Sequence, residues 1–450
     1  MKRKVVSAFL AAAMAMSMAA VPASASDATE AENPVDLNVT TTFAGEDGNA
    51  QNYRDACDAW SEATGNTVVD SSATSDETFK ATVATDFETG SEPDVLFYFN
   101  GADANSFISA GKVVSIDDIR AEYPEYASNM NDDLIPGSLV DGKKYAVPVN
   151  GYWEGLFYNE SILKEAGADV PGPDTTMDQF KDICQKVKDA GYTPIAAALG
   201  NIPHYWWEYM IFNHNSPENH LTIPQSADDE RGQAWVAGLN DIKDLYEAGF
   251  FPENTLTATD DETFASFTDG KAAFLLDGSW KVGGIAGACQ SDPADPSTLD
   301  ADKLAQFSVT YVPGNGDRKA TDLIGGLSMG YYITKKAWDD PDKRAAAVSF
   351  VEFMTSDDEV VKFAQHSATA LKEAPQVNQD ELNSLQIKAI NMMAGVTSLT
   401  GAVQDLFQGE CRTSTFDGMP EIVTGSVDAK DAVQEGLDLY YEMAEASTEA

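Results

Sequence analysis

Aromatic residues stand beside acidic or amide residues at several places where the sequence changes from apolar to polar. Aromatic rings can stack on the flat apolar faces of a sugar ring, and carboxylates and amides can pair with its hydroxyls, so that no polar group is buried without a partner. This combination indicates a site for a polyhydroxylated ligand. The candidate ligand-binding residues of this kind are Glu46, Asp47, Tyr98, Asn100, Tyr152, Trp153, Glu154, Trp206, Trp207, Asp277 and Trp280.

The tryptophans differ in how well they suit a site. Trp280 follows the apolar run and turn "LLDGS", at the expected end of a strand. Trp206 and Trp207 are adjacent in "PHYWWEYM"; we expect one of them to face the core and the other the site, and the sequence leaves open which. Three further tryptophans are expected to be structural: Trp60, Trp235 and Trp338.

Signatures of metal-dependent catalysis and of phosphate binding are absent from the sequence, which contains no HExxH and no glycine-rich phosphate loop. Three of the four histidines fall within "HYWWEYMIFNHNSPENH", at irregular spacing, and the four cysteines form no CxxC pair. We therefore expect a binding protein without a metal or other cofactor, and not an enzyme.

The N-terminus indicates export. Lys2, Arg3 and Lys4 precede an apolar run, and "ASA" ends at residue 25, which is typical of a secretory signal peptide over residues 1–25. A membrane anchor is the alternative, but the run is short for a span of about 20 residues. Residues 26–35 are acidic and without periodicity, which predicts a disordered leader. The first cysteine is Cys57, so no lipid-bearing cysteine follows the cleavage point, and we expect an extracellular or periplasmic protein.

Composition limits the partners. The chain has 73 acidic against 29 basic residues and a formal net charge of −44, which opposes binding to nucleic acid or to an anionic membrane surface. Cys57 and Cys184 lie in helical patterns and are expected to be buried thiols. A disulfide between Cys289 and Cys411 is left open.

Strands and helices alternate along the chain, which predicts an α/β architecture. Expected strands include 37–43, 93–99, 145–149 and 156–158, and expected helices include those in "NYRDACDAWSEATG" and "TMDQFKDICQKVKDAG". The interruption between 149 and 156, with Gly151, two aromatics and an acid, is unusual for one strand in one sheet. It is understandable if the chain passes there from one domain to another.

Several segments in order resemble the extracellular solute-binding proteins of ABC importers, in the carbohydrate-binding family that includes maltose-binding protein. They are "EPDVLFYFNG", "DGKKYAVPVNGYWEGLFYNESILKEAG", "PDTTMDQFKDICQKVKDAG", "FTDGKAAFLLDGSW", "IGGLSMGYYITKKA" followed by "PDKRAAAVSFVEFMTSDD", and "SVDAKDAVQEGLDL". Met177 stands where the family usually has Trp. The likeness covers nearly all of the expected mature chain.

The resemblance implies two lobes, each a mostly parallel sheet flanked by helices, with a ligand cleft and a hinge between them. It divides the chain into lobe 1 (36–150), lobe 2 (151–325), a return to lobe 1 (326–378) and C-terminal helices of lobe 2 (379–450). Gly326 would lie at the second crossing and Trp280 would be the family's cleft tryptophan. The implied partners are a carbohydrate ligand and the permease subunits of an importer, with the binding protein itself a monomer.

Other functions are weighed against this one. A binding protein for another solute, such as a polyamine, would fit the acidic composition, although a linear amine needs fewer rings. A secreted glycoside hydrolase would need two carboxyl groups at a defined separation, and no pair stands out. A cell-surface adhesin often has repeats or a stalk, and neither is present.

Overall fold

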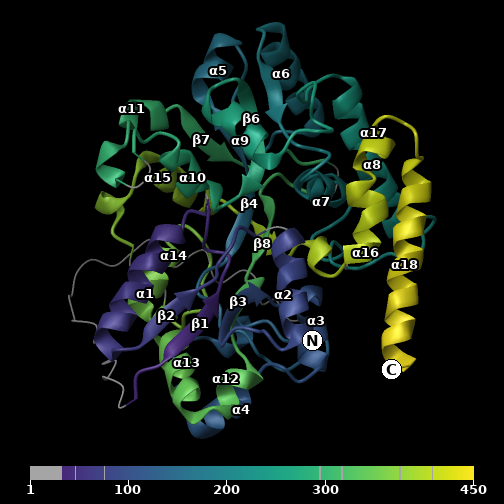
Figure 1. Ribbon diagram of the computed structural model, residues 1–450. Coiled ribbons are helices and arrows are strands. Elements are labelled where there is room, and N and C mark those ends of the chain that lie inside the picture. The colour runs from purple at the N-terminus through teal and green to yellow at the C-terminus, as the bar shows by residue number, and fades with distance from the viewer. Residues whose placement is uncertain are drawn as a thin grey trace, which may run out of the picture.

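The computed structural model describes residues 33–45, 47–75, 77–292, 295–315, 318–373, 377–407 and 409–449. The expected signal peptide, most of the expected leader and Glu46 lie outside these residues. Within them the chain forms two α/β lobes, one above the other in Figure 1. No helix of the described residues is both long enough and apolar enough to cross a membrane.

Lobe 1 is built on a four-stranded sheet with the order β2-β1-β3-β9. Its strands are β1 (Asp36–Thr40), β2 (Thr67–Asp70), β3 (Val95–Phe99) and β9 (Met329–Ile333). β1 runs parallel to β2 and β3, and β9 runs antiparallel to β3. Along β3, Val95 and Phe97 pack into one apolar cluster while Leu96 and Tyr98 pack into another, so both faces of the sheet are buried.

Helices on both sides of this sheet bury its faces. They are α1 (Ala50–Thr64), α2 (Glu77–Thr89), α3 (Asn105–Ser109), α4 (Ile116–Glu122), α12 (Lys335–Asp339), α13 (Pro341–Met354) and α14 (Asp357–Phe363), with the short 3₁₀ turns η1 (Ala102–Ala104) and η2 (Asp132–Leu134). Trp60 and Trp338 are buried here, as predicted.

Lobe 2 is built on a mixed sheet with the order β10-β8-β4-β6-β5, and β7 also pairs with β4. Its strands are β4 (Tyr152–Asn159), β5 (Thr193–Ala196), β6 (Ala272–Gly278), β7 (Phe307–Thr310), β8 (Asp322–Gly326) and β10 (Ser398–Thr400). β4 runs antiparallel to β6, β7 and β8, so this sheet is less parallel than we expected.

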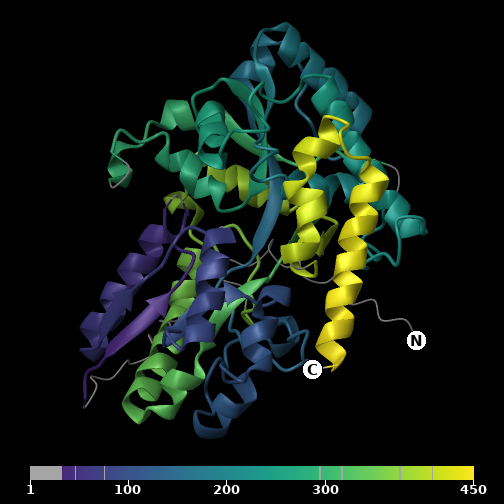
Figure 2. The ribbon, with the colours of Figure 1, turned by 45° about the vertical axis from the view of Figure 1, so that its right-hand side comes forward.

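The lobe 2 helices enclose one large apolar core. They are α5 (Glu160–Glu165), α6 (Met177–Asp189), α7 (His204–Phe212), α8 (Glu230–Glu247), α9 (Asp260–Thr268), α10 (Lys281–Gly287), α11 (Ala301–Leu304), α15 (Ser384–Met393), α16 (Gly409–Arg412), α17 (Met419–Val423) and α18 (Ala429–Glu449). Figure 2 shows α16 and α18 side by side at one edge of this lobe.

The cysteines and Trp235 are also buried. Cys57, Cys184 and Trp235 lie in the cores, as predicted. Cys289 carries a free thiol, and the Cys411 thiol lies 3.6 Å from Sδ of Met443, so no disulfide joins these two cysteines.

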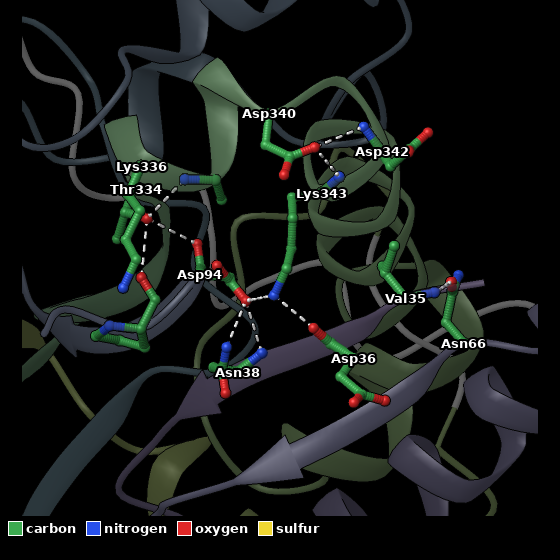
Figure 3. A network of polar contacts seen from close by, with 12 residues as sticks. Val35, Asp36, Asn38, Asn66, Asp94, Thr334, Lys336, Asp340, Asp342 and Lys343 are labelled. Carbon is green, nitrogen blue, oxygen red and sulfur yellow. Dashed lines mark hydrogen bonds and ion pairs between the residues drawn. The ribbon is translucent and has the colours of Figure 1, made fainter. Parts of the chain in front are cut away.

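A buried carboxylate holds the start of β3 to β1 and α13 (Figure 3). Asp94 is 2% exposed, and its Oδ2 accepts hydrogen bonds from the backbone and side-chain nitrogens of Asn38 at 2.8 and 2.9 Å. The Lys343 ammonium donates to the same oxygen at 2.6 Å. Asp340 caps the N-terminus of α13 and so fixes the turn that carries Lys343.

We expect Asp94→Ala to lower the free energy of unfolding by about 2–4 kcal/mol, because it removes the buried carboxylate that accepts from two nitrogens of Asn38 and from the Lys343 ammonium. Urea unfolding would measure the loss. The control is Asp339→Ala, which removes an exposed ion pair with Lys335 and should cost less than about 1 kcal/mol. Equal losses for the two variants would contradict a special role of Asp94.

Candidate ligand-binding site

Three half-buried aromatic rings lie together at the edge of lobe 2 that faces lobe 1. Trp280 follows β6, Tyr152 begins β4 and Tyr205 lies in the first turn of α7. The Trp280 ring centroid is 6.3 Å from that of Tyr152 and 6.1 Å from that of Tyr205. A Cβ on Gly278 would come within 2.1 Å of the Trp280 ring, so this ring lies flat over the last residue of β6. The three rings form an aromatic surface, which we call the aromatic wall.

Two carboxylates are buried behind the aromatic wall. Asp277 is 1% exposed, accepts a hydrogen bond from the Gly278 amide at 2.7 Å and lies 3.7 Å from the Lys281 ammonium. Burial raises the pKa of Asp277 to about 7, although Lys281 opposes the shift. Glu154 is also 1% exposed, and its Oε2 has no hydrogen-bond partner among the described residues. Burial, together with nearby Glu208, Asp277 and Asp405, raises the pKa of Glu154 well above its ordinary value.

A third carboxylate, Asp405, is held in place by Glu208 of α7. Glu208 is fully buried and accepts hydrogen bonds from the Val403 amide at 3.0 Å and the Gln404 amide at 2.7 Å. The Nε2 atom of His220 lies 3.2 Å from the same carboxylate. Glu208 therefore fixes the turn η5 (Val403–Asp405), which follows β10. Burial raises the pKa of Asp405 to about 7.

Lobe 1 contributes acidic and amide groups from the loops after β1 and β3. Asp47 accepts a hydrogen bond from the Asn49 amide at 2.7 Å, and burial raises its pKa to about 6. The Asn100 amide and side chain donate to the carbonyls of Ser328 at 2.8 Å and Leu327 at 3.0 Å. Asn100 thus fastens the end of β3 to the segment that links β8 with β9.

Basic groups lie beside these acids. Lys80 pairs with Asp103 at 3.1 Å and lies over the ring of Phe99. Arg412 of lobe 2 lies 3.7 Å from the same Asp103 of lobe 1. His204, whose pKa is lowered to about 3 by burial and then by the nearby Lys80 and Arg412, is neutral at pH 7.

The lobes touch where glycines allow the backbones to approach. A Cβ on Gly283 of α10 would come within 2.4 Å of the Cα of Gly48 in lobe 1. A Cβ on Gly101 of lobe 1 would come within 2.8 Å of the Asp405 carbonyl oxygen in lobe 2. The structure is therefore a closed arrangement of the two lobes around the site.

The backbone crosses between the lobes beside the site. Val147 pairs with Tyr331 of β9 in lobe 1, and a few residues later Tyr152 pairs with Gly326 of β8 in lobe 2. The Gly151 amide donates to the Ala368 carbonyl at 2.7 Å, so a third segment runs alongside. Gly326 has φ of +154°, a conformation that side chains disfavour, which explains a glycine at the end of β8.

The structure brings together some of the predicted site residues. Trp280, Tyr152, Glu154 and Asp277 lie in one cluster, with Gly326 paired to Tyr152 at its edge. Asp47 and Asn100 lie on loops of lobe 1 that face it.

Other predicted residues are core residues in this structure. Trp153 is fully buried and donates to the His366 carbonyl at 2.8 Å. Tyr98 is 2% exposed and packs with Phe79 and Phe107 on one face of the lobe 1 sheet.

The expectation that one of Trp206 and Trp207 faces the site is wrong for this structure. The two side chains are 1% and 0% exposed, because α7 is buried on all sides from Trp206 to Phe212. Trp206 packs against Phe180, and Trp207 packs against Trp235.

Sequence reasoning missed Tyr205 and Asp405. Tyr205 precedes the two tryptophans, and its position in the first turn of α7 could have indicated that its side chain faces the site. Asp405 follows a strand of three residues, too short to be recognised from pattern.

Comparison with known proteins identifies the family. The model of the bacterial extracellular solute-binding protein family matches residues 45–361, and the chain belongs to that family. The resemblance drawn from the sequence motifs is therefore confirmed. A stretch of 113 residues is 30% identical to an uncharacterized ABC transporter extracellular-binding protein of Pyrococcus horikoshii, and it covers 24% of each chain.

Solved structures share the two-lobed fold. A chitin oligosaccharide binding protein superimposes with a TM-score of 0.75 at 20% identity, over 91% of this chain and 98% of that one. The GacH receptor of Streptomyces glaucescens, studied without ligand and with acarbose, superimposes with a TM-score of 0.68 at 16% identity, over 91% and 98% of the two chains. At these identities the likeness shows the fold of a periplasmic binding protein.

We expect Asp405→Asn to raise the free energy of unfolding by about 1–2 kcal/mol at pH 8. The pKa of Asp405 is raised from 3.8 to about 7 in the folded protein, so above pH 7 its ionised form destabilises the fold relative to the unfolded chain. The cost shrinks as the pH falls from 7 toward 3.8, because the folded protein then binds the proton first. Urea unfolding at pH 8, 6 and 4.5 should show the gain of the variant shrinking in that order.

The exposed substitution Asp58→Asn controls for the change of net charge in this experiment. If Asp405→Asn were less stable than the unchanged protein at pH 8, the pairing of the carboxylate with Lys80 and Arg412 would outweigh its burial.

Proposed function

We propose that the chain is the extracellular substrate-binding component of an ABC importer and that its ligand is a sugar. The observation that carries the proposal is the aromatic wall of Tyr152, Tyr205 and Trp280 beside Glu154 and Asp277, at the meeting of two lobes. Rings provide stacking surfaces and carboxylates accept hydroxyl hydrogens, which together match the two kinds of surface that a sugar presents.

The transport role follows from this binding role. Ligand that prefers the closed lobes shifts the protein toward that form by its difference in affinity for the two forms. The permease subunits of the importer would then receive the closed, loaded monomer. Residues 1–25 would direct secretion, and the protein would act outside the cytoplasmic membrane.

The names of the structural neighbours support a carbohydrate over other solutes. One is a chitin oligosaccharide binding protein, and RafE was solved in complex with raffinose. In keeping with these neighbours and with the family, we propose that the chain binds its ligand without chemical change.

A cationic solute such as a polyamine is the second candidate. It is favoured by one observation, the raised pKa values of Asp47, Glu154, Asp277 and Asp405 around a single site. A cationic amine would pair with these carboxylates, whose burial the nearby basic side chains offset only in part.

A thermal-unfolding panel of sugars, oligosaccharides and polyamines should separate the candidates. A ligand at 100 times its dissociation constant adds about 2.7 kcal/mol of stability, which is a shift of several degrees for a chain of this size.

Trp280→Ala should weaken the binding of the sugar that gives the shift by about tenfold or more. Trp280→Phe should lose less affinity than Trp280→Ala, since a ring remains to stack on the sugar. A shift with polyamines alone would reject the sugar, and release of products from an oligosaccharide would reject a pure binding role.

We expect Gly283→Ala to separate stability from binding. Alanine in place of glycine favours helix α10 by about 0.5–1 kcal/mol, but its Cβ would meet Gly48 when the lobes close. The unliganded variant should therefore unfold at the same or a higher temperature, while ligand affinity falls about tenfold or more.

Gly287→Ala is the matched control for Gly283→Ala. It lies at the end of the same helix, and a Cβ there would meet nothing within 4 Å. It should keep full affinity. Unchanged ligand binding in Gly283→Ala would show that binding does not require this contact between the lobes.

A further inference from the structure

Two glycine contacts between the lobes lie at opposite ends of the aromatic wall. At one end, Gly48 of lobe 1 meets Gly283 and the Trp280 carbonyl, directly after β6. At the other end, Gly101 of lobe 1 meets the Asp405 carbonyl, a few residues after β10. In Figure 1, α1 of lobe 1 lies below α10 on one side of β4, and α3 of lobe 1 lies below α16 on the other.

The strands that lead to these two ends give the scale of the distance between them. The order of the lobe 2 sheet places β6, β4, β8 and β10 next to one another, so three strand spacings separate the end of β6 from the end of β10. At the usual spacing between neighbouring strands the span is about 14 Å. This length accommodates two or three linked sugar rings and no longer chain.

The end at Asp405 is closed by charged side chains as well as by backbone. Arg412 of lobe 2 reaches to 3.7 Å from Asp103 of lobe 1, and Lys80 pairs with the same Asp103 at 3.1 Å. The Arg412 side chain is only 8% exposed, and Asp405 lies close enough to Lys80 and Arg412 for both to oppose the rise in its pKa. A sugar chain that continued past this end would have to separate these groups.

The positions of Tyr152 and Glu208 connect this end wall to the aromatic wall. The Tyr152 hydroxyl accepts a hydrogen bond from the Ala402 amide at 3.2 Å, and Glu208 binds the next two amides of the same loop. The loop that ends the site is therefore fixed to the residues that would stack on the ligand, so it cannot move aside independently of them.

We infer that the site takes a short saccharide, of one to three sugar rings, which the lobes enclose at both ends, and that it excludes longer chains. This inference rests on the proposed function and narrows it. It assigns to Gly101, Asp103, Asp405 and Arg412 the role of an end wall that limits ligand length.

Binding of length ladders tests the inference. The probes are four series from one to six units: α-1,4-linked glucose, β-1,4-linked glucose, β-1,4-linked xylose and β-1,4-linked N-acetylglucosamine, each titrated calorimetrically into the full-length mature protein. In the series that binds, affinity should be highest at one to three units and fall about tenfold or more by four or five. A second measurement uses the longest member that still binds tightly, with a bulky 2-aminobenzamide group on its reducing end, and the label should lower its affinity by at least about tenfold.

Each outcome decides a different claim. Affinity that keeps rising beyond three units, or a labelled sugar that binds as well as the free one, would overturn the length limit and leave the sugar-binding function standing. If no sugar in these series or in the wider panel binds, the proposed function fails and the inference fails with it. Loss of affinity with length and with the label supports both.

Discussion

Hydrogen bonds between the chain segments that cross from lobe to lobe are the constraint on which the site depends. Tyr152 pairs with Gly326, and Gly151 donates to Ala368, so three crossings are held together at one level. β4 begins and β8 ends beside these hydrogen bonds, so the edges of the two sheets face each other there. Side chains that follow β3 and β6, and those that begin β4, therefore converge although they are far apart in sequence. A ligand placed there contacts both lobes at once, which is the condition for coupling binding to closure.

The carboxylates around this level make the unliganded site electrostatically unfavourable. Burial raises the pKa of Asp47, Asp277 and Asp405, and Glu154 has an oxygen with no hydrogen-bond donor in the part of the chain that the structure describes. A ligand that donates hydrogen bonds to the ionised carboxylates would favour that form and lower their pKa values. Binding of a neutral sugar should then be linked to proton release near pH 7.

The fold could be predicted from the sequence to a large extent, because it depends on local patterns. Apolar runs such as 93–99 and the capped segment "TMDQFKDICQKVKDAG" form a strand and a helix close to where they were expected, β3 and α6. The expected strand over 145–149 is instead extended chain with a single bridge from Val147 to Tyr331, since only one partner is available to it at the crossing. The direction of β4 was beyond pattern analysis, because an antiparallel strand has the same apolar sequence as a parallel one.

Strand ends guided the choice of candidate site residues best, although Trp153 at the start of β4 and Tyr98 near the end of β3 are core residues. Trp280 and Tyr152 lie at the end of β6 and the start of β4, and alternation along a strand limits where such side chains can point. Helix α7 offers no such guide: its residues from Trp206 to Phe212 are all buried, so hydrophobic periodicity does not mark a side facing the site. Asp405 depends on Glu208, nearly two hundred residues earlier in the chain, for its position. A contact of that kind leaves no local pattern.

Close contacts at glycines help to define the closed arrangement, beside the Arg412–Asp103 contact between the lobes, and this has a consequence for recognition. At Gly48, Gly283 and Gly101 the two backbones approach so closely that even a methyl group would separate them. Such contacts bury little apolar surface, so they contribute little free energy to closure by themselves. They set the geometry of the closed lobes without strongly favouring it. The free energy that keeps the lobes together must then come from a ligand that fills the space between the aromatic wall and the loops of lobe 1, and a ligand too short to reach both, or too long to fit between the glycine contacts, would supply less of it.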